Sequence, residues 1–377
     1  MVTPRNALIV GVALALTMGL AWGGHEVPVY PSYYPHEVSL ETMSPERAAG
    51  LLGEAKLHAY LGPEPGYAGA APPSVHTIES LGNFVIVRIN PGHSMPDEPA
   101  SCDIVEAVVR DMAGREGFVF HPYPVTPFDG NYLYHGDRAE AEKARLLGQP
   151  TAPPRGLRVK AEGLTAGLVR PEWRTQGTEW DAAVEAIGAA ELVAESKNSL
   201  NGWLGPPWVK TGWFHAARLL ADATGDLARR QRSDALAQRL ESGDYRDAVE
   251  RVNLERELVA ALNLGCRKRI AGYTLKRQYF SAEFTSGIEN IGFGSIEGLD
   301  SPIFIRTVKL KDFPWNGWLN LGIDGKPGTA WNPIAGFGDR FGRFLWSAVG
   351  DPALFSSPYD SGWMLNRIAD VQSSAAR

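Results

Sequence analysis

The chain has 377 residues, with 37 Lys and Arg against 43 Asp and Glu, which gives a formal net charge of −6 at pH 7. Both signs are spread along the sequence and do not gather in basic stripes, so the composition argues against nucleic acid as a partner. With 44% hydrophobic residues, the chain can bury a sizeable core, and its length suffices for two or three domains.

Residues 1–24 have the pattern of an export segment. Arg5 gives a positive start, an uncharged apolar run follows from Ala7 to Trp22, and small residues end the segment. As a helix, this run of about 16 residues would measure about 24 Å, slightly less than the ~30 Å core of a membrane. We therefore expect a signal peptide or a short membrane anchor. The rest of the chain is then periplasmic, or anchored to the inner membrane and facing the periplasm, and it meets the membrane only through this segment if it is uncleaved.

The next part of the chain divides into a proline-rich arm and an α/β domain. Three prolines within residues 25–37 forbid a helix and favour an extended arm. In residues 38–147, the spacing predicts strands over 38–42, 57–60, 84–89 and 118–120, and helices over 45–55, 101–112 and 138–147. This order of elements resembles a ferredoxin-like sandwich, and it also fits half of a periplasmic-binding-protein lobe.

Three further regions follow. Residues 148–177 are rich in Pro and Gly and are expected to be a linker. Residues 178–270 form a helical region, with helices expected over 180–195, 209–223, 227–240 and 249–262. Residues 271–377 form a mixed β and loop region rich in aromatic residues, with strands over 273–280 and 303–310 and an amphipathic stretch over 341–349. The expected fold class is α+β, with an N-terminal ferredoxin-like α/β sandwich, a helical segment and a mixed C-terminal region.

The chain has two cysteines, Cys102 and Cys266. In an oxidising compartment they can pair, and they can equally remain two separate buried thiols, because spacing alone does not fix their geometry. No CxxC or CxxCH motif is present.

Most histidines lie in the first part of the chain and are the candidate ligands of a transition metal ion. Imidazole and carboxylate groups suit Zn, Cu or Ni. The arm carries two His-Glu pairs, and two further histidines lie on loops that also carry Asp129 and Asp137. The candidates are His25, His36, His121 and His135. The alternative is that these are solvated polar residues.

Tryptophans on Gly- and Pro-rich loops are the candidate ligand-binding residues. Indole faces can stack on a sugar, hold a quaternary ammonium or line an apolar pocket. The candidates are Trp203, Trp208, Trp213, Trp315 and Trp318, and Trp331, Trp346 and Trp363 come later. The alternative is ordinary burial of large side chains beneath long loops.

The sequence has no GxSxG elbow, no P-loop and no HExxH motif. Acid pairs such as Asp300 with Asp312, or Glu283 with Glu289, suit general acid–base chemistry, but pairs of this kind occur in every protein of this size. The leading hypothesis is an exported accessory or ligand-binding protein of the bacterial envelope, without its own catalysis and with a small molecule or an envelope protein as partner. The alternatives are an exported metal-dependent enzyme that uses the N-terminal histidines, and a structural subunit of an envelope complex.

Overall fold

The computed structural model describes residues 35–67, 69–92, 98–148, 154–201, 206–282, 287–311, 313, 317–332, 336–350, 352–366 and 368. The predicted export segment and most of the proline-rich arm lie outside these residues. Within the described ranges, no helix combines the length and the apolar character needed to cross a membrane.

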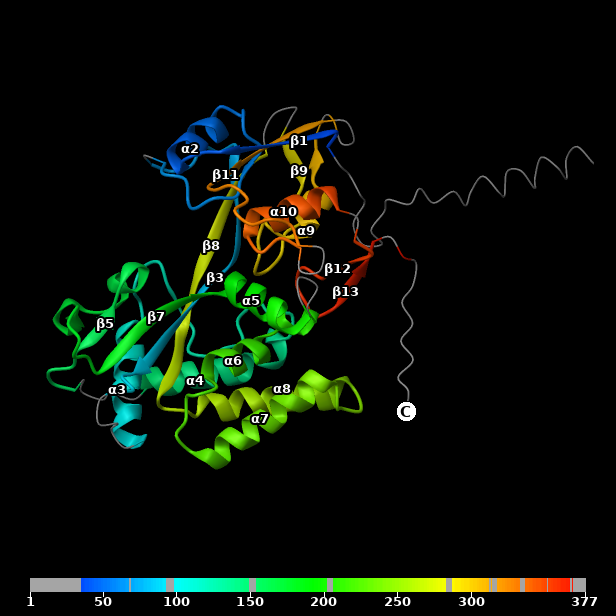
Figure 1. The fold of residues 1–377 in the computed structure, drawn as a ribbon. Helices are drawn as coiled ribbons and strands as arrows, with labels where there is room; N and C mark the ends of the chain where they lie inside the picture. The colour runs from blue at the N-terminus through cyan, green and yellow to red at the C-terminus, as the bar shows by residue number, and fades with distance from the viewer. Residues whose placement is uncertain are drawn as a thin grey trace, which may run out of the picture.

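A mixed nine-stranded sheet extends through the fold, with two long antiparallel strands at its centre (Figure 1). These are β3 (Val75–Ile89) and β8 (Lys268–Ser281), which pair along almost their whole length. The strand order is β1-β11-β2-β8-β3-β7-β5-β6, and β4 pairs with β8 off this path. The remaining strands of the sheet are β1 (Glu37–Thr42), β2 (Ala59–Tyr60), β4 (Val119–Phe120), β5 (Val159–Ala161), β6 (Arg174–Thr175), β7 (Ala182–Gly188) and β11 (Trp318–Ile323).

The neighbours of β3 and β8 change along their length, which divides the described chain into two lobes. Within β3, only residues 83–89 pair with β7, whereas β2 pairs with the end of β8 at Tyr279 and Phe280. We call residues 82–274 the lower lobe, and residues 35–81 with 275–368 the upper lobe (Figure 1). The boundary falls where the β3–β8 register shifts, between Leu81 and Phe84.

The upper lobe packs on both faces of its part of the sheet. Ile78 and Phe280 lie in one buried cluster with residues of α9 and α10, whereas Val75 and Tyr279 lie in another with α2. Alternate residues of a strand point to opposite faces, so each strand serves both clusters. The elements outside the large sheet are α2 (Pro45–Gly53), β9 (Ile288–Asn290), α9 (Pro302–Thr307), β10 (Lys309–Leu310), α10 (Arg340–Val349), β12 (Leu354–Ser356) and β13 (Trp363–Leu365).

The lower lobe uses the same alternation. Phe84 and Ile86 of β3 contribute to a cluster with α5, α6, α7 and α8, and Val85 and Val87 contribute to a second cluster with α3. The helices are α3 (Glu98–Asp111), α4 (Gly136–Gly148), α5 (Ala189–Asn201), α6 (Gly212–Leu220), α7 (Leu227–Ser242) and α8 (Ala248–Asn263). The described part of this lobe also has four short 3-10 helices, η1 (Tyr132–Tyr134), η2 (Gly163–Leu168), η3 (Pro171–Trp173) and η4 (Pro207–Lys210).

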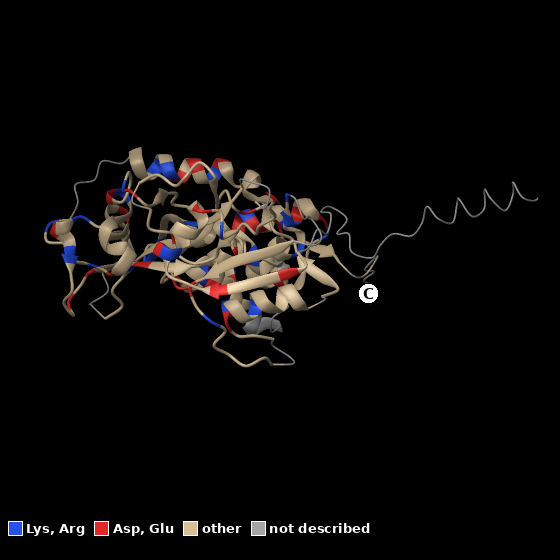
Figure 2. Cartoon of the chain, turned by 90° about the horizontal axis from the view of Figure 1, so that it is seen from above, with Lys and Arg blue, Asp and Glu red and all other residues tan. Residues whose placement is uncertain are grey.

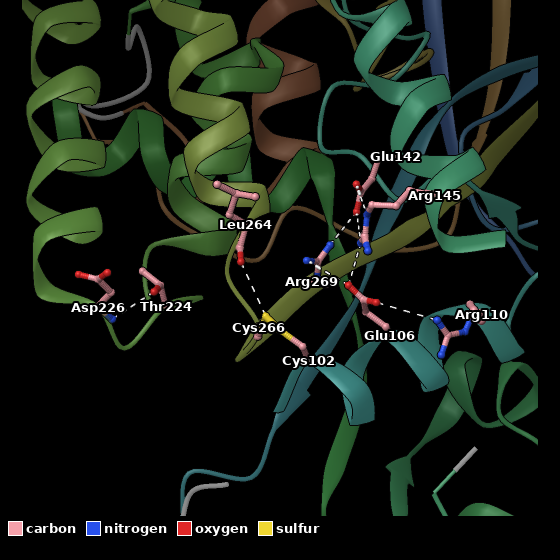
Figure 3. The surroundings of a disulfide bond; sticks show 10 residues. All are labelled: Cys102, Glu106, Arg110, Glu142, Arg145, Thr224, Asp226, Leu264, Cys266 and Arg269. Atoms are coloured by element: carbon pink, nitrogen blue, oxygen red, sulfur yellow. Dashed lines mark hydrogen bonds and ion pairs between the residues drawn. A yellow bond between two sulfur atoms is a disulfide. The ribbon is translucent and has the colours of Figure 1, made fainter. Parts of the chain in front are cut away.

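Cys102 of α3 and Cys266, just before β8, form a disulfide with a sequence separation of 164 (Figure 3). Of the two alternatives that the sequence allowed, pairing is the one observed. The bond ties the first helix of the lower lobe to the strand that leaves it.

A buried ion cluster lies next to this disulfide and joins α3, α4 and β8 (Figure 3). Arg269 has a side chain only 7% exposed, and its guanidinium lies 2.7 Å from Glu142 and 3.3 Å from Glu106. Arg145 contacts the same two carboxylates, at 2.8 and 2.7 Å. Two carboxylates thus balance the charge of two guanidinium groups, and the buried Arg269 is paired, as a buried charge requires.

The structure confirms an α+β fold, but a ferredoxin-like N-terminal sandwich is not confirmed. The partners of β3 are β7 and β8, and both lie outside residues 38–147. The expected helix over 180–195 is wrong in its first half, because Ala182–Gly188 is a strand paired with β3. The expected strand over 303–310 is also wrong. Ser301 caps a helix there, with Pro302 in its first turn, and only Lys309–Leu310 is a strand.

Lys and Arg are interspersed with Asp and Glu along the helices of the described chain (Figure 2). This arrangement agrees with the mixed charge pattern of the sequence.

Candidate functional site

A cavity of about 540 Å³ lies where the two lobes meet. One wall comes from α5 of the lower lobe, and the opposite wall comes from α10 and the β12–β13 hairpin of the upper lobe (Figure 1). Leu81 and Gly82 of β3 and Lys276 of β8 also line it, so both central strands contribute at the lobe boundary.

The lower wall results from the direct passage of β7 into α5. The strand ends at Gly188 and the helix begins at the next residue, so the first turn of α5 follows directly on the end of β7. Val193 is 2% exposed and anchors the helix in the lower core, while Glu191 and Glu195 on the same helix line the cavity and are exposed. Helical periodicity therefore places an apolar anchor and two carboxylates on neighbouring parts of the cavity wall.

The upper wall is built on α10. Asp339 caps this helix, and its carboxylate accepts hydrogen bonds from the backbone of Gly342 and Thr329. Phe344 lies on the buried face of the helix and is 1% exposed, while Arg343 and Trp346 line the cavity. Gly342 permits the close approach of Phe337, another lining residue, because a Cβ at this position would lie 2.6 Å from the phenyl ring.

Asp300 organises the charges at one side of the cavity. Its Oδ2 atom lies 2.6 Å from Nζ of Lys276 and 2.8 Å from Nε of Arg340. Arg340 also lies 3.3 Å from Asp324 and donates to the carbonyl of Leu61. One carboxylate is thus shared by two cations, each of them held in place by a further contact.

Glu297 forms a second, deeper ion pair. Its Oε2 atom lies 3.3 Å from Nζ of Lys210, whose side chain is 4% exposed and also donates to the carbonyl of Ser357 at 2.8 Å. Lys210 belongs to the lower lobe, whereas Glu297 and Ser357 belong to the upper one. This pair therefore bridges the lobes beside the cavity.

Arg343 differs from the other basic residues of the cavity, because no ion pair to it occurs within the described ranges. Its guanidinium donates to the carbonyl of Gly338 at 2.6 Å. Burial lowers the pKa of Arg343, because removing water penalises the charged guanidinium. The cavity thus has a partly desolvated cation on the α10 wall, and the carboxylates of Glu191 and Glu195 on the α5 wall.

Of the tryptophans predicted to bind a ligand, the three that the structure describes do not line the cavity. Trp213 is 3% exposed and packs against Trp208, with ring centroids 5.5 Å apart, inside the lower core. These contacts are those of the alternative, ordinary burial. Trp318 is 68% exposed at the start of β11, away from the cavity lining. Trp203 and Trp315 lie outside the described residues.

The histidines predicted to bind a metal also lie apart or have other partners. The Nε2 atom of His121 lies 2.8 Å from the carbonyl of Val125. The Nδ1 atom of His135 lies 2.9 Å from the Tyr123 hydroxyl, and burial lowers the pKa of His135 to about 4. His36 is exposed just before β1, and His25 lies outside the described residues. In the described ranges, no group of three or more His, Cys, Asp or Glu residues is placed to hold a metal ion.

The sequence alone predicted little of the cavity, because the lining residues come from many separate segments between Leu81 and Trp363. Two signals did lie within it. The amphipathic stretch over 341–349 is α10, and the later tryptophans include Trp346 and Trp363, which both line the cavity. Asp300 was noted only as half of an unspecific acid pair.

Neither a protein-family model nor a curated protein sequence matches the chain. Solved structures similar to it include a putative peptide binding protein and an ABC transporter substrate binding protein. A putative peptide binding protein, AppA from Clostridium difficile, is 12% identical with a TM-score of 0.42; the match covers 71% of this chain and 60% of that one. HbpA2 from Haemophilus parasuis is 12% identical with a TM-score of 0.41, over 71% of this chain and 56% of that one.

The ABC transporter substrate binding protein CtaP from Listeria monocytogenes is 9% identical with a TM-score of 0.40, over 72% of this chain and 59% of that one. In each of these three cases the match spans less than two thirds of the solved structure.

Proposed function

We propose that this chain is an exported ligand-binding protein that holds a small molecule in the cavity between its lobes, without catalysis of its own. The observation that carries the proposal is the cavity itself, whose volume of about 540 Å³ lies within the range of ligand pockets, roughly 300–1,000 Å³. Its lining combines apolar and aromatic side chains with a few charged groups, which is the usual composition of such a site.

Two of the four carboxylates that line the cavity are held in ion pairs, which suits a role in binding. Asp300 is held between Lys276 and Arg340, and Glu297 is paired with Lys210. Carboxylates fixed in ion pairs orient a ligand, whereas a general base needs to be free to take a proton from its substrate. Export is supported by the sequence pattern of residues 1–24 alone.

Native mass spectrometry of the protein, purified gently from its source, tests the proposal. We expect an excess mass that disappears on denaturation. Trp346→Ala alters the cavity wall and is expected to reduce the bound fraction, whereas the control Trp318→Ala changes an exposed indole outside the cavity and leaves it unchanged. A protein that carries no extra mass, and whose melting temperature no small molecule raises, would contradict the proposal.

A further inference from the structure

The charges that line the cavity are unequally satisfied, and this inequality indicates a class of ligand. Asp300 pairs with both Lys276 and Arg340, Arg340 pairs with Asp324 as well, and Glu297 has Lys210. Among the described residues, Arg343 is left without an ion pair on the α10 wall. Glu191 and Glu195 likewise have none on the α5 wall, where they are exposed.

Arg343 is the part of the cavity best suited to an anion. One hydrogen bond orients the guanidinium, which donates to the carbonyl of Gly338. Only one of its donor groups is used by that bond, and a guanidinium has five N–H donors in a planar fork. A planar carboxylate matches this fork with two parallel hydrogen bonds.

Aromatic side chains share the cavity lining with this cation and provide a surface for an apolar ligand body. Trp346 lies one helical turn after Arg343 and is itself backed by Trp331, at a centroid distance of 5.8 Å. Phe337, Phe355 and Trp363 complete the aromatic part of the lining. Flat aromatic groups pack well against such faces, in offset or edge-to-face arrangements.

The α5 wall limits how many negative charges the ligand can carry. Glu191 and Glu195 would repel a second anionic group placed at the far end of the ligand from Arg343. We infer that the cavity binds an aromatic monocarboxylate, with its carboxylate on Arg343 and its ring against Trp346. This inference rests on the proposed function and specifies its ligand.

Isothermal titration calorimetry of the full chain with three probes tests the inference. The probes are 3-phenylpropanoate, its neutral amide, and the para-dicarboxylate that carries a second propanoate chain. We expect the monocarboxylate to bind about tenfold more tightly than the amide, because a hydrogen-bonded ion pair replaces a hydrogen bond between the charged guanidinium and a neutral carbonyl. We expect the dicarboxylate to bind more weakly than the monocarboxylate.

Two sets of variants locate the effect. Arg343→Met is expected to abolish the preference for the acid over the amide, while Arg343→Lys retains part of it. The double variant Glu191→Gln, Glu195→Gln is expected to improve dicarboxylate binding, and Trp318→Phe serves as the unchanged control. Circular dichroism and the melting temperature establish that each variant is folded.

Three results would overturn the inference. Equal affinity for the acid and the amide would remove the role of Arg343, and so would an acid preference that survives in Arg343→Met. Absence of binding by all three probes would exclude this ligand class. The proposed function fails separately, when the purified protein retains no small molecule; a retained molecule without an acid group would support that function and refute this inference.

Discussion

The Nζ atom of Lys276 lies 2.6 Å from the Asp300 carboxylate, and this ion pair joins β8 to the loop that precedes α9. Asp300 is 11% exposed at its side chain and also binds Arg340, so it holds two cations at the side of the cavity. Removing the negative charge would leave two partly buried positive groups facing each other.

We therefore expect Asp300→Asn to lower the free energy of unfolding by about 1–3 kcal/mol, measured by urea denaturation. Asp324→Asn is the matched control, because Asp324 contacts the same Arg340 at 3.3 Å but is 35% exposed, and its loss should cost less than about 1 kcal/mol. If the two variants lost the same free energy of unfolding, Asp300 would contribute no more to these ion pairs than the exposed Asp324 does.

Gly82 lies at the lobe boundary, where β3 and β8 approach closely. A Cβ on Gly82 would lie 2.9 Å from both the carbonyl and the Oγ1 atom of Thr274. The same Oγ1 accepts hydrogen bonds from the backbone and side-chain amides of Asn83, both at 3.0 Å. A methyl group would therefore push apart backbone that the neighbouring bonds hold in place.

Gly82→Ala is expected to lower the melting temperature, with a cost of about 1–3 kcal/mol. Gly188→Ala, also in the cavity lining, is the control: its Cβ would meet mainly the flexible end of the Glu191 side chain, at 3.0 Å, and should cost less than about 1 kcal/mol. The prediction would be wrong if Gly188→Ala were the more damaging of the two.

The buried Glu255 and the partly buried Asp129 of the lower lobe give the stability a pH dependence. Burial raises the pKa of Asp129 to about 6 and the pKa of Glu255 to about 7. Asn131 connects them, donating its backbone N–H to Asp129 and its side-chain amide to Glu255, and Arg251 lies 3.3 Å from Glu255. A pKa raised in the folded state means that the folded protein binds more protons than the unfolded chain between the two pKa values. The contribution of these groups to stability is therefore present at acidic pH and is lost as the pH rises through about 7.

The buried histidines act in the opposite direction. Burial lowers the pKa of both His135 and His215 to about 4, so their contribution is present near neutral pH and is lost as the pH falls from about 6.5 toward 4. The pH dependence of wild-type stability is thus the sum of two opposite contributions, from the carboxylates and from the histidines. Glu255→Gln removes the contribution of Glu255 and leaves that of the histidines. The advantage of wild type over this variant should be larger at pH 5 than at pH 8, by about 2 kcal/mol. Denaturation curves at the two pH values measure it, and a difference independent of pH would refute the assignment.

The disulfide between Cys102 and Cys266 closes a long loop around most of the lower lobe. We expect the double variant Cys102→Ser, Cys266→Ser to lose about 4–5 kcal/mol of unfolding free energy in the chain-entropy model. Peptide mapping without reductant should recover the two cysteines in one cross-linked fragment. If wild type, reduced wild type and the double variant unfold at the same denaturant concentration, the bond contributes nothing to stability.

Local signals in the sequence predicted several helices correctly. One such signal, a capping serine followed by proline, occurs both at a helix that was predicted and at a helix that was mistaken for a strand. Ser44 precedes Pro45 at the start of α2, and its Oγ accepts from Arg47, as expected. Ser301 and Pro302 repeat this pattern at α9, but the β-branched Ile303 and Ile305 favoured a strand instead. A capping residue followed by proline outweighed intrinsic β propensity.

The other error and the cavity have a common physical reason. Residues 182–188 are rich in alanine and suit a helix, yet they form β7 because seven of their backbone positions pair with β3. That pairing depends on a segment about a hundred residues earlier, and no local pattern reports it. The cavity also depends on segments that are distant in the sequence, because Leu81, Glu191 and Arg343 line it together only after both lobes have folded.

The division of the chain between the lobes also bears on the order of assembly. The lower lobe is encoded by one uninterrupted stretch, whereas the upper lobe needs both ends of the described sequence, and β1 pairs in parallel with β11 near the far end. A chain synthesised from its N-terminus therefore presents β1 long before its partner exists. Contacts that are distant in sequence form slowly, because loop closure precedes any gain from pairing. The upper lobe contains the first described residues but is therefore the last lobe to be completed. Until β11 is synthesised, β1 has no partner strand.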